Sequence, residues 1–405
     1  MEADFLKEEQ KTDQAYDFVF DKRLYIIFLI LFTEVLGSTL VFPVIPYLGF
    51  ELGLTPLQIG FILSVFSICQ LFASPITGKL SDHFGRKPLL ILSQISTFVG
   101  FIFLGFATTT ILLIIARLID GLLGSNMTVS QAYISDITEP KNRTRVFGYS
   151  SGVFGAGLIF GPLIGAVLVT INYSVPMFFA AAITLISIAL VILFLPETIP
   201  KKTDKISLRV NDIIPIDDVR LFVRTHHIRN SLLMFFTYNT AFFLFISNIS
   251  LFAIAQFNAA PEQVSFYIFW IGAIRVGIQT VLIARILRFF GEKRALATGI
   301  FSMIIAMMAI AFSAEYLFVL VPLIFLAYGT GVSRPILTSK LANSVTQKET
   351  GAILGVNNSL TSFAQIIAPI SGGFIIEYSP SQTLPLLSAI IFTLLIFLMR
   401  KRTKL

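Results

Sequence analysis

Apolar stretches long enough to cross a bilayer recur along the whole chain, separated by short polar segments. An α-helix rises ~1.5 Å per residue, so about 20 apolar residues cross the ~30 Å hydrocarbon core. The pattern therefore predicts an all-α integral membrane protein with twelve transmembrane helices, near residues 24–47, 56–79, 89–107, 110–135, 144–170, 174–195, 229–255, 262–287, 295–314, 316–340, 350–376 and 381–399. Thr55, Pro56 and Gln58 form a capping sequence at the predicted start of the second helix.

The longest polar segment divides these helices six and six. It is rich in charge and proline, which is typical of a linker with room for a short surface helix. The predicted organisation is an N-terminal tail (1–23), a six-helix bundle (24–195), a central linker (196–228), a second six-helix bundle (229–400) and a C-terminal tail (401–405). The first tail contains seven acids, unlike the basic start of a cleavable signal peptide.

Lysine and arginine lie almost entirely on one side of this topology. The loops on the other side, near 48–55, 108–109, 171–174, 256–261, 315 and 377–381, contain neither residue. Because basic loops stay in the cytosol, we expect a multi-pass cell-membrane protein with both termini cytosolic. The net charge of +7 is then a topology signal, and no nucleic-acid partner is expected.

Composition excludes several other classes of protein. The chain is 55% hydrophobic and 13% charged, about half the charged fraction of a soluble domain. Its single cysteine excludes an internal disulfide, and its three histidines fall in polar loops, so no metal site is expected. The sequence has no phosphate-binding loop for an ATP-driven pump. We expect neither an enzyme nor an organic cofactor.

The two bundles resemble each other. "GKLSDHFGRKPLL" (78–90) after the second helix corresponds to "ARILRFFGEKRAL" (284–296) after the eighth, and "GLIFGPLIG" (157–165) corresponds to "QIIAPISGG" (365–373). Gly85 and Gly291 are 206 residues apart, and Pro162 and Pro369 are 207 apart. This shared offset predicts a duplicated six-helix unit, which is typical of transporters.

Several motifs resemble those of the major facilitator superfamily. The loop from Gly78 to Pro88 matches the cytosolic pattern G-x-L-x-D-x-x-G-R-K-x at every fixed position, and Leu195-Pro-Glu-Thr is similar to the family's exit from helix six. The fifth-helix stretch resembles the proton-driven antiporter branch, and the first helix resembles tetracycline-type drug exporters. The resemblance implies two pseudo-symmetric halves, a proton gradient as energy source and alternating access. The antiporter motif comprises Gly157, Gly161, Pro162 and Gly165, whose glycines share one helix face.

The loop motif is expected to act as a conformational latch. Asp82 can cap a helix that begins at the cytosol, and in the family it does so on helix eleven. Arg86 lies at the level of Asp136, which closes helix four, and Arg143 follows in the next loop. The latch candidates are Gly78, Asp82, Gly85, Arg86, Lys87, Asp136 and Arg143, with Lys87 the best example of a plain topological charge.

Ionisable residues inside spans are expensive and therefore functional candidates. Glu34 lies roughly 15 Å deep in the first helix, and either carries protons or is bonded structurally. Arg117 and Asp120 can pair at i, i+3 in helix four, where the family pattern R-x-x-Q-G has glutamine for Asp120. Asp120 either neutralises Arg117 or is a second proton site. The candidates for proton coupling and the substrate cavity are Glu34, Arg117, Asp120, Asn239, Asn248, Arg275 and Arg334.

These observations favour a proton-coupled secondary transporter, acting as a monomer that exports a small amphipathic molecule. A proton symporter importing a sugar, organic acid, peptide or other nutrient is the alternative. Substrate, direction and proton stoichiometry are not specified by the sequence.

Overall fold

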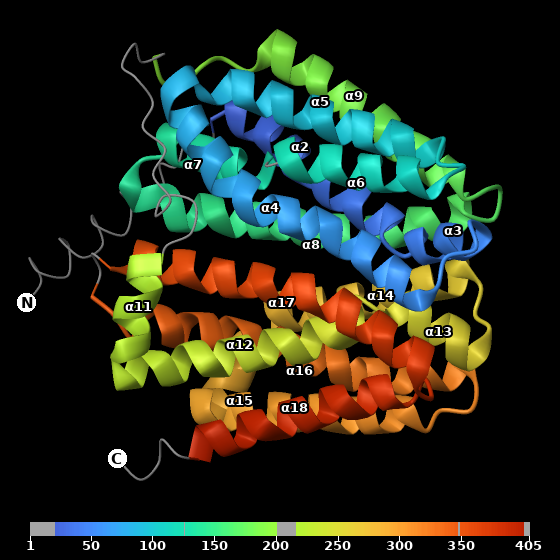
Figure 1. Cartoon of the computed structure of the whole chain (residues 1–405). Coiled ribbons are helices and arrows are strands. Elements are labelled where there is room, and N and C mark those ends of the chain that lie inside the picture. Colours follow the sequence, from blue (N-terminus) through green and yellow to red (C-terminus); the bar gives the residue numbers. More distant parts are fainter. Residues whose placement is uncertain (1–20, 125, 201–215, 347–348, 401–405) are drawn as a thin grey trace, which may run out of the picture.

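The computed structural model describes residues 21–124, 126–200, 216–346 and 349–400. Most of both predicted tails and the central part of the predicted linker therefore lie outside the described residues. The first half consists of the helices α2 (Arg23–Val41), α3 (Ile45–Glu51), α4 (Pro56–Phe84), α5 (Arg86–Gly105), α6 (Thr110–Leu123), α7 (Asn126–Ile137), α8 (Arg143–Leu168) and α9 (Ser174–Phe194), with a 3₁₀ turn at Pro140–Asn142 (Figure 1).

The second half has the same kind of architecture. It consists of α11 (Ile216–Arg224), α12 (His226–Ile246), α13 (Ile249–Phe257), α14 (Pro261–Gly277), the π-helix η2 (Ile278–Leu282), α15 (Ile283–Ala311), the 3₁₀ helix η3 (Tyr316–Val319), α16 (Leu320–Ala342), α17 (Thr350–Tyr378) and α18 (Thr383–Arg400). The short helix α11 lies within the predicted linker, and its Phe222 packs with Ile228, Leu341 and Ile353 of the second half.

The observed helices are consistent with the twelve predicted spans. In the described part of the chain, nine helices are long and apolar enough to cross a membrane. One of them, Pro261–Ala311, has 51 residues, about twice the length of one span, and turns at Gly291. The bent pair Ile228–Ile246 and Ile249–Phe257 and the shorter apolar helix Thr383–Met399 supply the remaining spans. The all-α membrane fold is confirmed.

The backbone repeats between the halves. Gly85 and Gly291, equivalent by sequence, both adopt positive φ angles, +105° and +67°, at the turn between two spans. The first span breaks between α2 and α3, and the seventh breaks between α12 and α13. These breaks meet, because Ser250 Oγ donates to the carbonyl of Pro43 at 3.1 Å, and the two residues are 207 apart.

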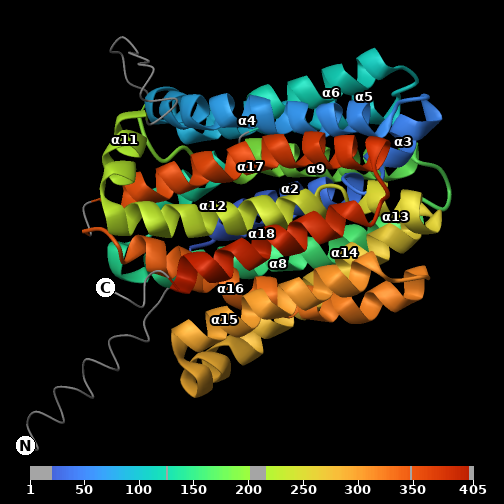
Figure 2. The same cartoon turned by 60° about the horizontal axis from the view of Figure 1, so that its bottom comes forward.

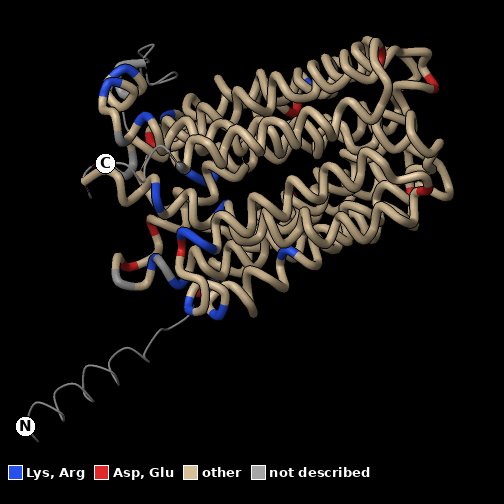
Figure 3. Tube along the Cα trace, turned by 90° about the horizontal axis from the view of Figure 1, so that it is seen from below, with Lys and Arg blue, Asp and Glu red and all other residues tan. Residues whose placement is uncertain are grey.

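The halves pack through two equivalent pairs of helices, α4 with α17 and α8 with α14 (Figure 2). Lys and Arg gather at one end of the molecule, where α2 begins and α18 ends, and we call this the basic end (Figure 3). The opposite end, which carries α3 and α13, is the far end (Figure 1).

The halves are joined near the far end. Tyr47 Oη donates to Ala259 O at 2.7 Å, and Leu57 N donates to Glu377 Oε2 at 2.9 Å. Deeper along α4, Ser64 Oγ donates to Ile366 O at 2.7 Å. The far end is therefore closed by direct contacts between the two bundles.

Candidate functional site

Glu34 belongs to a polar cluster inside the first half. It lies near the middle of α2 and is half-buried. Its Oε2 accepts a hydrogen bond from Asn126 Nδ2 at 2.7 Å, and the same nitrogen lies 3.2 Å from Thr97 Oγ1 of α5. Among the described residues, Glu34 has no ion pair with a basic side chain. An acid inside the membrane is thus held by neutral groups.

A break in the fourth span positions Asn126. Helix α6 ends at Leu123, Gly124 leaves helical geometry, and Asn126 begins α7. The backbone N–H of Gly124 bonds to Asp120 O at 2.8 Å, and its carbonyl accepts from the side chain of Gln70. Broken helices are tolerated in membranes where side chains satisfy the freed backbone groups. The sequence analysis predicted one span at 110–135, which agrees with the span Thr110–Ile137 of the structure, but it did not single out Asn126 within it.

Arg117 and Asp120 are paired, as their spacing predicted. Arg117 Nη2 lies 3.4 Å from Asp120 Oδ2, and both side chains are at most 10% exposed. The guanidinium also sits over the Phe66 ring, 5.6 Å from its centroid. Asp120 interacts electrostatically with Glu34, which it repels when both are charged. The pair thus keeps one positive and one negative charge together beside the Glu34 carboxyl.

The second half contains basic groups instead of acids. Arg275 of α14 and Arg334 of α16 are half-buried and interact electrostatically with each other. Both also interact with Tyr238 of α12, which is 1% exposed. Within the described ranges, neither arginine has an ion pair. The two predicted basic residues thus share Tyr238 as an electrostatic neighbour.

The two predicted asparagines of helix seven have different environments. Asn239 Nδ2 donates to Thr361 Oγ1 of α17 at 2.9 Å. Asn248 is fully buried at the break between α12 and α13, where its Nδ2 bonds to Leu244 O and Ala368 O, both at 2.9 Å. The structure therefore places Asn248 in the contact between α12 and α17 and away from any open surface.

The first-half loop is organised around Arg86, whose side chain is 9% exposed. Its guanidinium contacts Asp82 Oδ1 at 2.5 Å, Asp136 Oδ2 at 2.9 Å and Ser81 Oγ at 2.6 Å. The expected link between this loop and the end of helix four is therefore present. Gly78, at the start of the motif, has Thr128 of α7 as the nearest neighbour of its Cβ position.

The expected cap on helix eleven is not seen in the described residues. Asp82 is 55% exposed and bonds to Arg86 of its own loop. The acid beside the start of α17 is Glu349, which accepts from Thr346 Oγ1 at 2.7 Å and Thr346 N at 3.1 Å. These hydrogen bonds lower the pKa of Glu349. In this structure the two halves are joined at the far end. Asp82 lies at the opposite, basic end, where it contacts its own loop.

Arg143 and Lys87 bind backbone carbonyls. Arg143 Nη2 donates to Ser135 O at 3.1 Å, near the end of α7, so this latch candidate caps that helix. Lys87 Nζ donates to Ile192 O at 2.8 Å, in the last turn of α9. Both cations thus occupy the negative end of a helix dipole, which offers them unpaired carbonyls.

Sequence reasoning missed the role of Glu197. Its carboxylate accepts from Arg86 N at 2.8 Å and Lys87 N at 3.0 Å, the first backbone donors of α5. A Cβ at Gly85 would collide with this carboxylate, so the glycine allows the approach. The sequence feature that could have indicated this contact is the acid of the Leu-Pro-Glu-Thr motif. Its partner helix is 111 residues away in sequence, and the two meet only in the folded chain.

The glycine motif of α8 packs closely on α2. A Cβ at Gly157 would lie 2.8 Å from Val35 Cβ, one at Gly161 would lie 2.8 Å from Leu36 O, and one at Gly165 would lie 3.3 Å from Leu40 O. Thr39 Oγ1 also donates to Gly157 O at 3.2 Å. Pro162 lies within the helix. The close approach predicted from the glycine spacing is confirmed.

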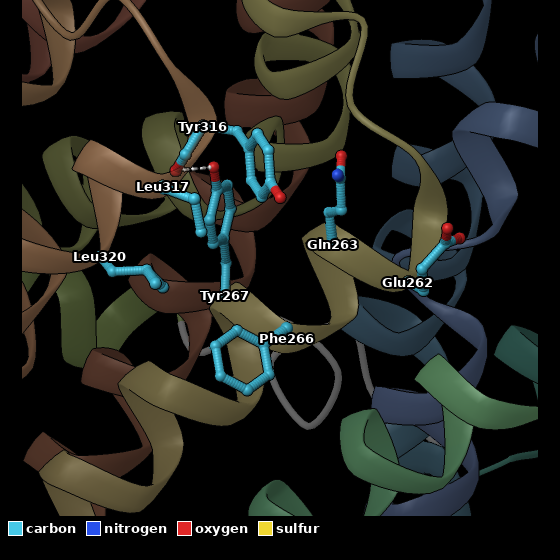
Figure 4. A pocket seen from close by; sticks show the side chains of 7 residues that line it. All are labelled: Glu262, Gln263, Phe266, Tyr267, Tyr316, Leu317 and Leu320. Carbon is cyan, nitrogen blue, oxygen red and sulfur yellow. Dashed lines mark hydrogen bonds between the residues drawn. The ribbon is translucent and has the colours of Figure 1, made fainter.

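One pocket lies at the far end of the second half, between α14 and η3 (Figure 4). It has a volume of about 260 Å³ and is lined by side chains that include Glu262, Phe266 and Tyr316. Tyr267 Oη bonds to Tyr316 O across it. This is smaller than typical drug-sized sites of ~300–1,000 Å³, and none of the predicted intramembrane residues lines it.

Comparison with known proteins gives consistent matches. The family model described as Major Facilitator Superfamily matches residues 27–369 and again residues 232–404. The chain is 31% identical to the tetracycline resistance protein, class H, of Pasteurella multocida over 93% of this chain and 95% of that protein. It is 27% identical to multidrug resistance protein 2 of Bacillus subtilis (strain 168), over 88% and 89% of the two chains.

Solved structures show the same fold. The human organic anion transporter TETRAN superposes with a TM-score of 0.69 at 22% identity, covering 93% of this chain and 98% of that one. A bacterial homologue of the human lysosomal transporter Spinster, solved in an inward-facing and unoccupied conformation, gives a TM-score of 0.73 at 13% identity, covering 94% and 97%.

Proposed function

Since the chain belongs to the Major Facilitator Superfamily, we propose that it exports a small amphipathic molecule in exchange for protons, with Glu34 as the proton carrier. Its relatives include tetracycline and multidrug resistance proteins, which supports export. The observation that carries the proposal is that Glu34, a half-buried acid within a span, has no basic partner among the described residues. Asp120 is already paired with Arg117, so we assign it to neutralising that charge.

The environment of Glu34 suits a group that alternates between two charge states. A charged carboxylate inside the membrane costs several kcal/mol, and a neutral carboxylic acid avoids this cost. When Glu34 is charged, the Asn126 amide donates to it. A substrate group that binds the carboxylate then competes with the proton, which links substrate arrival to proton departure. We propose that the proton gradient suffices as energy source, without a cofactor, and that the transporter works as a monomer.

The proposal is tested by Glu34→Gln in proteoliposomes with an imposed pH gradient. We expect the variant to stay folded but to lose pH-driven flux, because glutamine cannot release a proton, while Glu34→Asp keeps part of the activity. Glu51→Gln removes an exposed acid at the far end and is the control. Persistence of pH-driven flux at the wild-type rate would assign Glu34 a structural role.

The same assay separates export from the alternative of proton-coupled import. In exchange, substrate moves against the direction of proton flow, and in symport it moves with the protons. The sign of substrate movement in wild-type vesicles therefore decides between the two.

We propose that the basic end faces the cytosol, as the positive-inside rule implies. In a Cys69→Ser background, a cysteine replacing Asn172 at the far end should react with a membrane-impermeant maleimide in intact cells. A cysteine replacing Glu139 at the basic end should react only after permeabilisation. The opposite pattern would reverse the orientation. Lys202, the labelling position that the sequence suggests, lies outside the described residues.

A further inference from the structure

The two arginines of the second half lie on helices that pack together, α14 and α16. Arg275 stands 14 residues after the start of α14 at the far end, which places it roughly 21 Å from that end. A Cβ at Gly331 of α16 would lie 3.6 Å from the Arg275 carbonyl of α14, so Arg334 stands about one turn farther from the far end than Arg275. Both are half-buried and share Tyr238 as an electrostatic neighbour. Two like charges thus converge inside the membrane, without an acid partner among the described residues.

Both arginines stand next to an irregularity in their helix. The π-helix η2 begins three residues after Arg275, and Pro335 follows Arg334 within α16. Short π-helical segments occur frequently at functional sites. Isolated intramembrane cations are costly and are normally paired. Helix irregularity and unpaired charge together indicate a site that an anionic group completes.

The acid of the first half is not this partner. The electrostatic neighbour of Glu34 is Asp120, whereas those of Arg275 are Arg334 and Tyr238. Glu34 lies 11 residues into α2 from the basic end, roughly 16 Å deep. Across a ~30 Å core, Arg275 is then roughly 9 Å from the basic end, so Glu34 and Arg275 differ in depth by about 7 Å.

We propose that Arg275 and Arg334 bind the acidic group of the substrate, which is therefore a dipolar amphipathic molecule with a carboxylate or similar anion at one end. This inference rests on the proposed function, because Glu34 would bind the cationic or hydrogen-bond-donating end. Which end of the substrate binds at Glu34 follows from the coupling between substrate and proton. A substrate with only an anion would favour protonation of Glu34 and move with the proton, whereas a cationic group at Glu34 displaces the proton.

The test uses norfloxacin, which carries a carboxylate and an amine, and its ethyl ester, which lacks the carboxylate. Binding to the purified full-length protein is measured by ligand-induced thermal stabilisation. We expect wild type to bind the acid about tenfold more tightly than the ester, as for a charge-assisted hydrogen bond. Arg275→Gln and Arg334→Gln should each lower this preference while ester affinity stays the same, and the lysine variants should retain part of it.

Arg288→Gln, in the exposed loop at the basic end, should leave the preference intact. Equal binding of acid and ester by wild type, binding of neither, or a preference that survives both glutamine variants would overturn the proposal. The outcome is independent of proton coupling. Glu34→Gln should keep the preference, so a wild type that discriminates without pH-driven flux would refute the proposed function and leave this site standing.

Discussion

The two halves of the molecule share a backbone plan but carry opposite chemistry. The turn glycines Gly85 and Gly291 adopt similar positive φ angles, and both halves contain a broken span. Yet the first half holds the intramembrane acids Glu34 and Asp120, of which, among the described residues, only Asp120 is paired, with Arg117, whereas the second half holds Arg275 and Arg334. Backbone geometry is thus kept by the repeat, while the charged side chains differ. Such a division lets one half carry protons and the other bind substrate.

The two basic-end loops differ in the same way. In the first loop, Arg86 is buried between Asp82 and Asp136. In the second, Arg288 occupies the position equivalent to Asp82 and is exposed, as is Glu292 after the turn glycine. Among the described residues, the second loop has no ion pair. The first loop alone is therefore built to join helix ends.

The largest effect is expected from removing the centre of the first loop. Arg86→Met leaves Asp82 and Asp136 without their shared cation, and we expect transport to slow about tenfold, as for loss of a coupling contact of ~1–3 kcal/mol. Arg288→Met removes a charge from the second loop and should change transport less than twofold. Both are compared at equal expression in a vesicle flux assay. Equal effects in the two loops would remove the distinction between them.

An intermediate effect is expected from exchanging residues between the two equivalent helices. Gly161 of α8 corresponds, at an offset of 207, to Ala368 of α17. Gly161→Ala places a methyl against Thr39 and 2.8 Å from the Leu36 carbonyl, which cannot move without shifting α2. We expect a loss of ~1–3 kcal/mol in stability from overpacking.

The reverse change, Ala368→Gly, is the matched control. It removes one methyl group from a helix and should cost about 0.5–1 kcal/mol. Thermal unfolding in detergent, followed by tryptophan fluorescence, compares the two. If Gly161→Ala proves as stable as wild type, the contact between α2 and α8 is looser than its geometry indicates.

The smallest effect is expected at Glu197. Glu197→Gln keeps an oxygen acceptor for the first N–H groups of α5 but removes the charge that favours a helix N-terminus. A loss of ~0.3–1 kcal/mol in stability is expected. Glu292→Gln, at the equivalent turn of the second half, should have no measurable effect on the unfolding temperature. A larger loss at Glu292 than at Glu197 would contradict the assignment.

Local patterns sufficed to predict most of the fold. Hydrophobic runs gave the spans, and Thr55 and Gln58 form the predicted reciprocal cap, with Thr55 N 2.9 Å from Gln58 Oε1 and Gln58 N 3.4 Å from Thr55 Oγ1. Arg117 and Asp120 pair because both lie on one helix, where spacing fixes distance. Interactions within a turn are readable from sequence, because the backbone alone sets them.

Contacts between helices were predicted less completely. The Asn126 bond to Glu34 depends on a helix break at residue 124 that hydropathy does not detect. Arg143 was a candidate for the ionic latch but bonds to carbonyls at the end of α7, since several acceptors compete at a helix end. Glu197 reaches α5 only when the first half is folded. Choice among such partners depends on packing, which a single sequence does not specify.

The contact between Ser250 and Pro43 has a consequence for opening. The two residues lie at the breaks of the first and seventh spans, which are equivalent in the repeat, so a bond between them lies close to the axis that relates the halves. A solute leaving along that axis at the far end must part them. The Pro43 carbonyl then loses a donor in a region of low dielectric, and water has to take its place. Hydration of the exit is thus part of the opening itself, so dehydrating osmolytes should hold the far end shut.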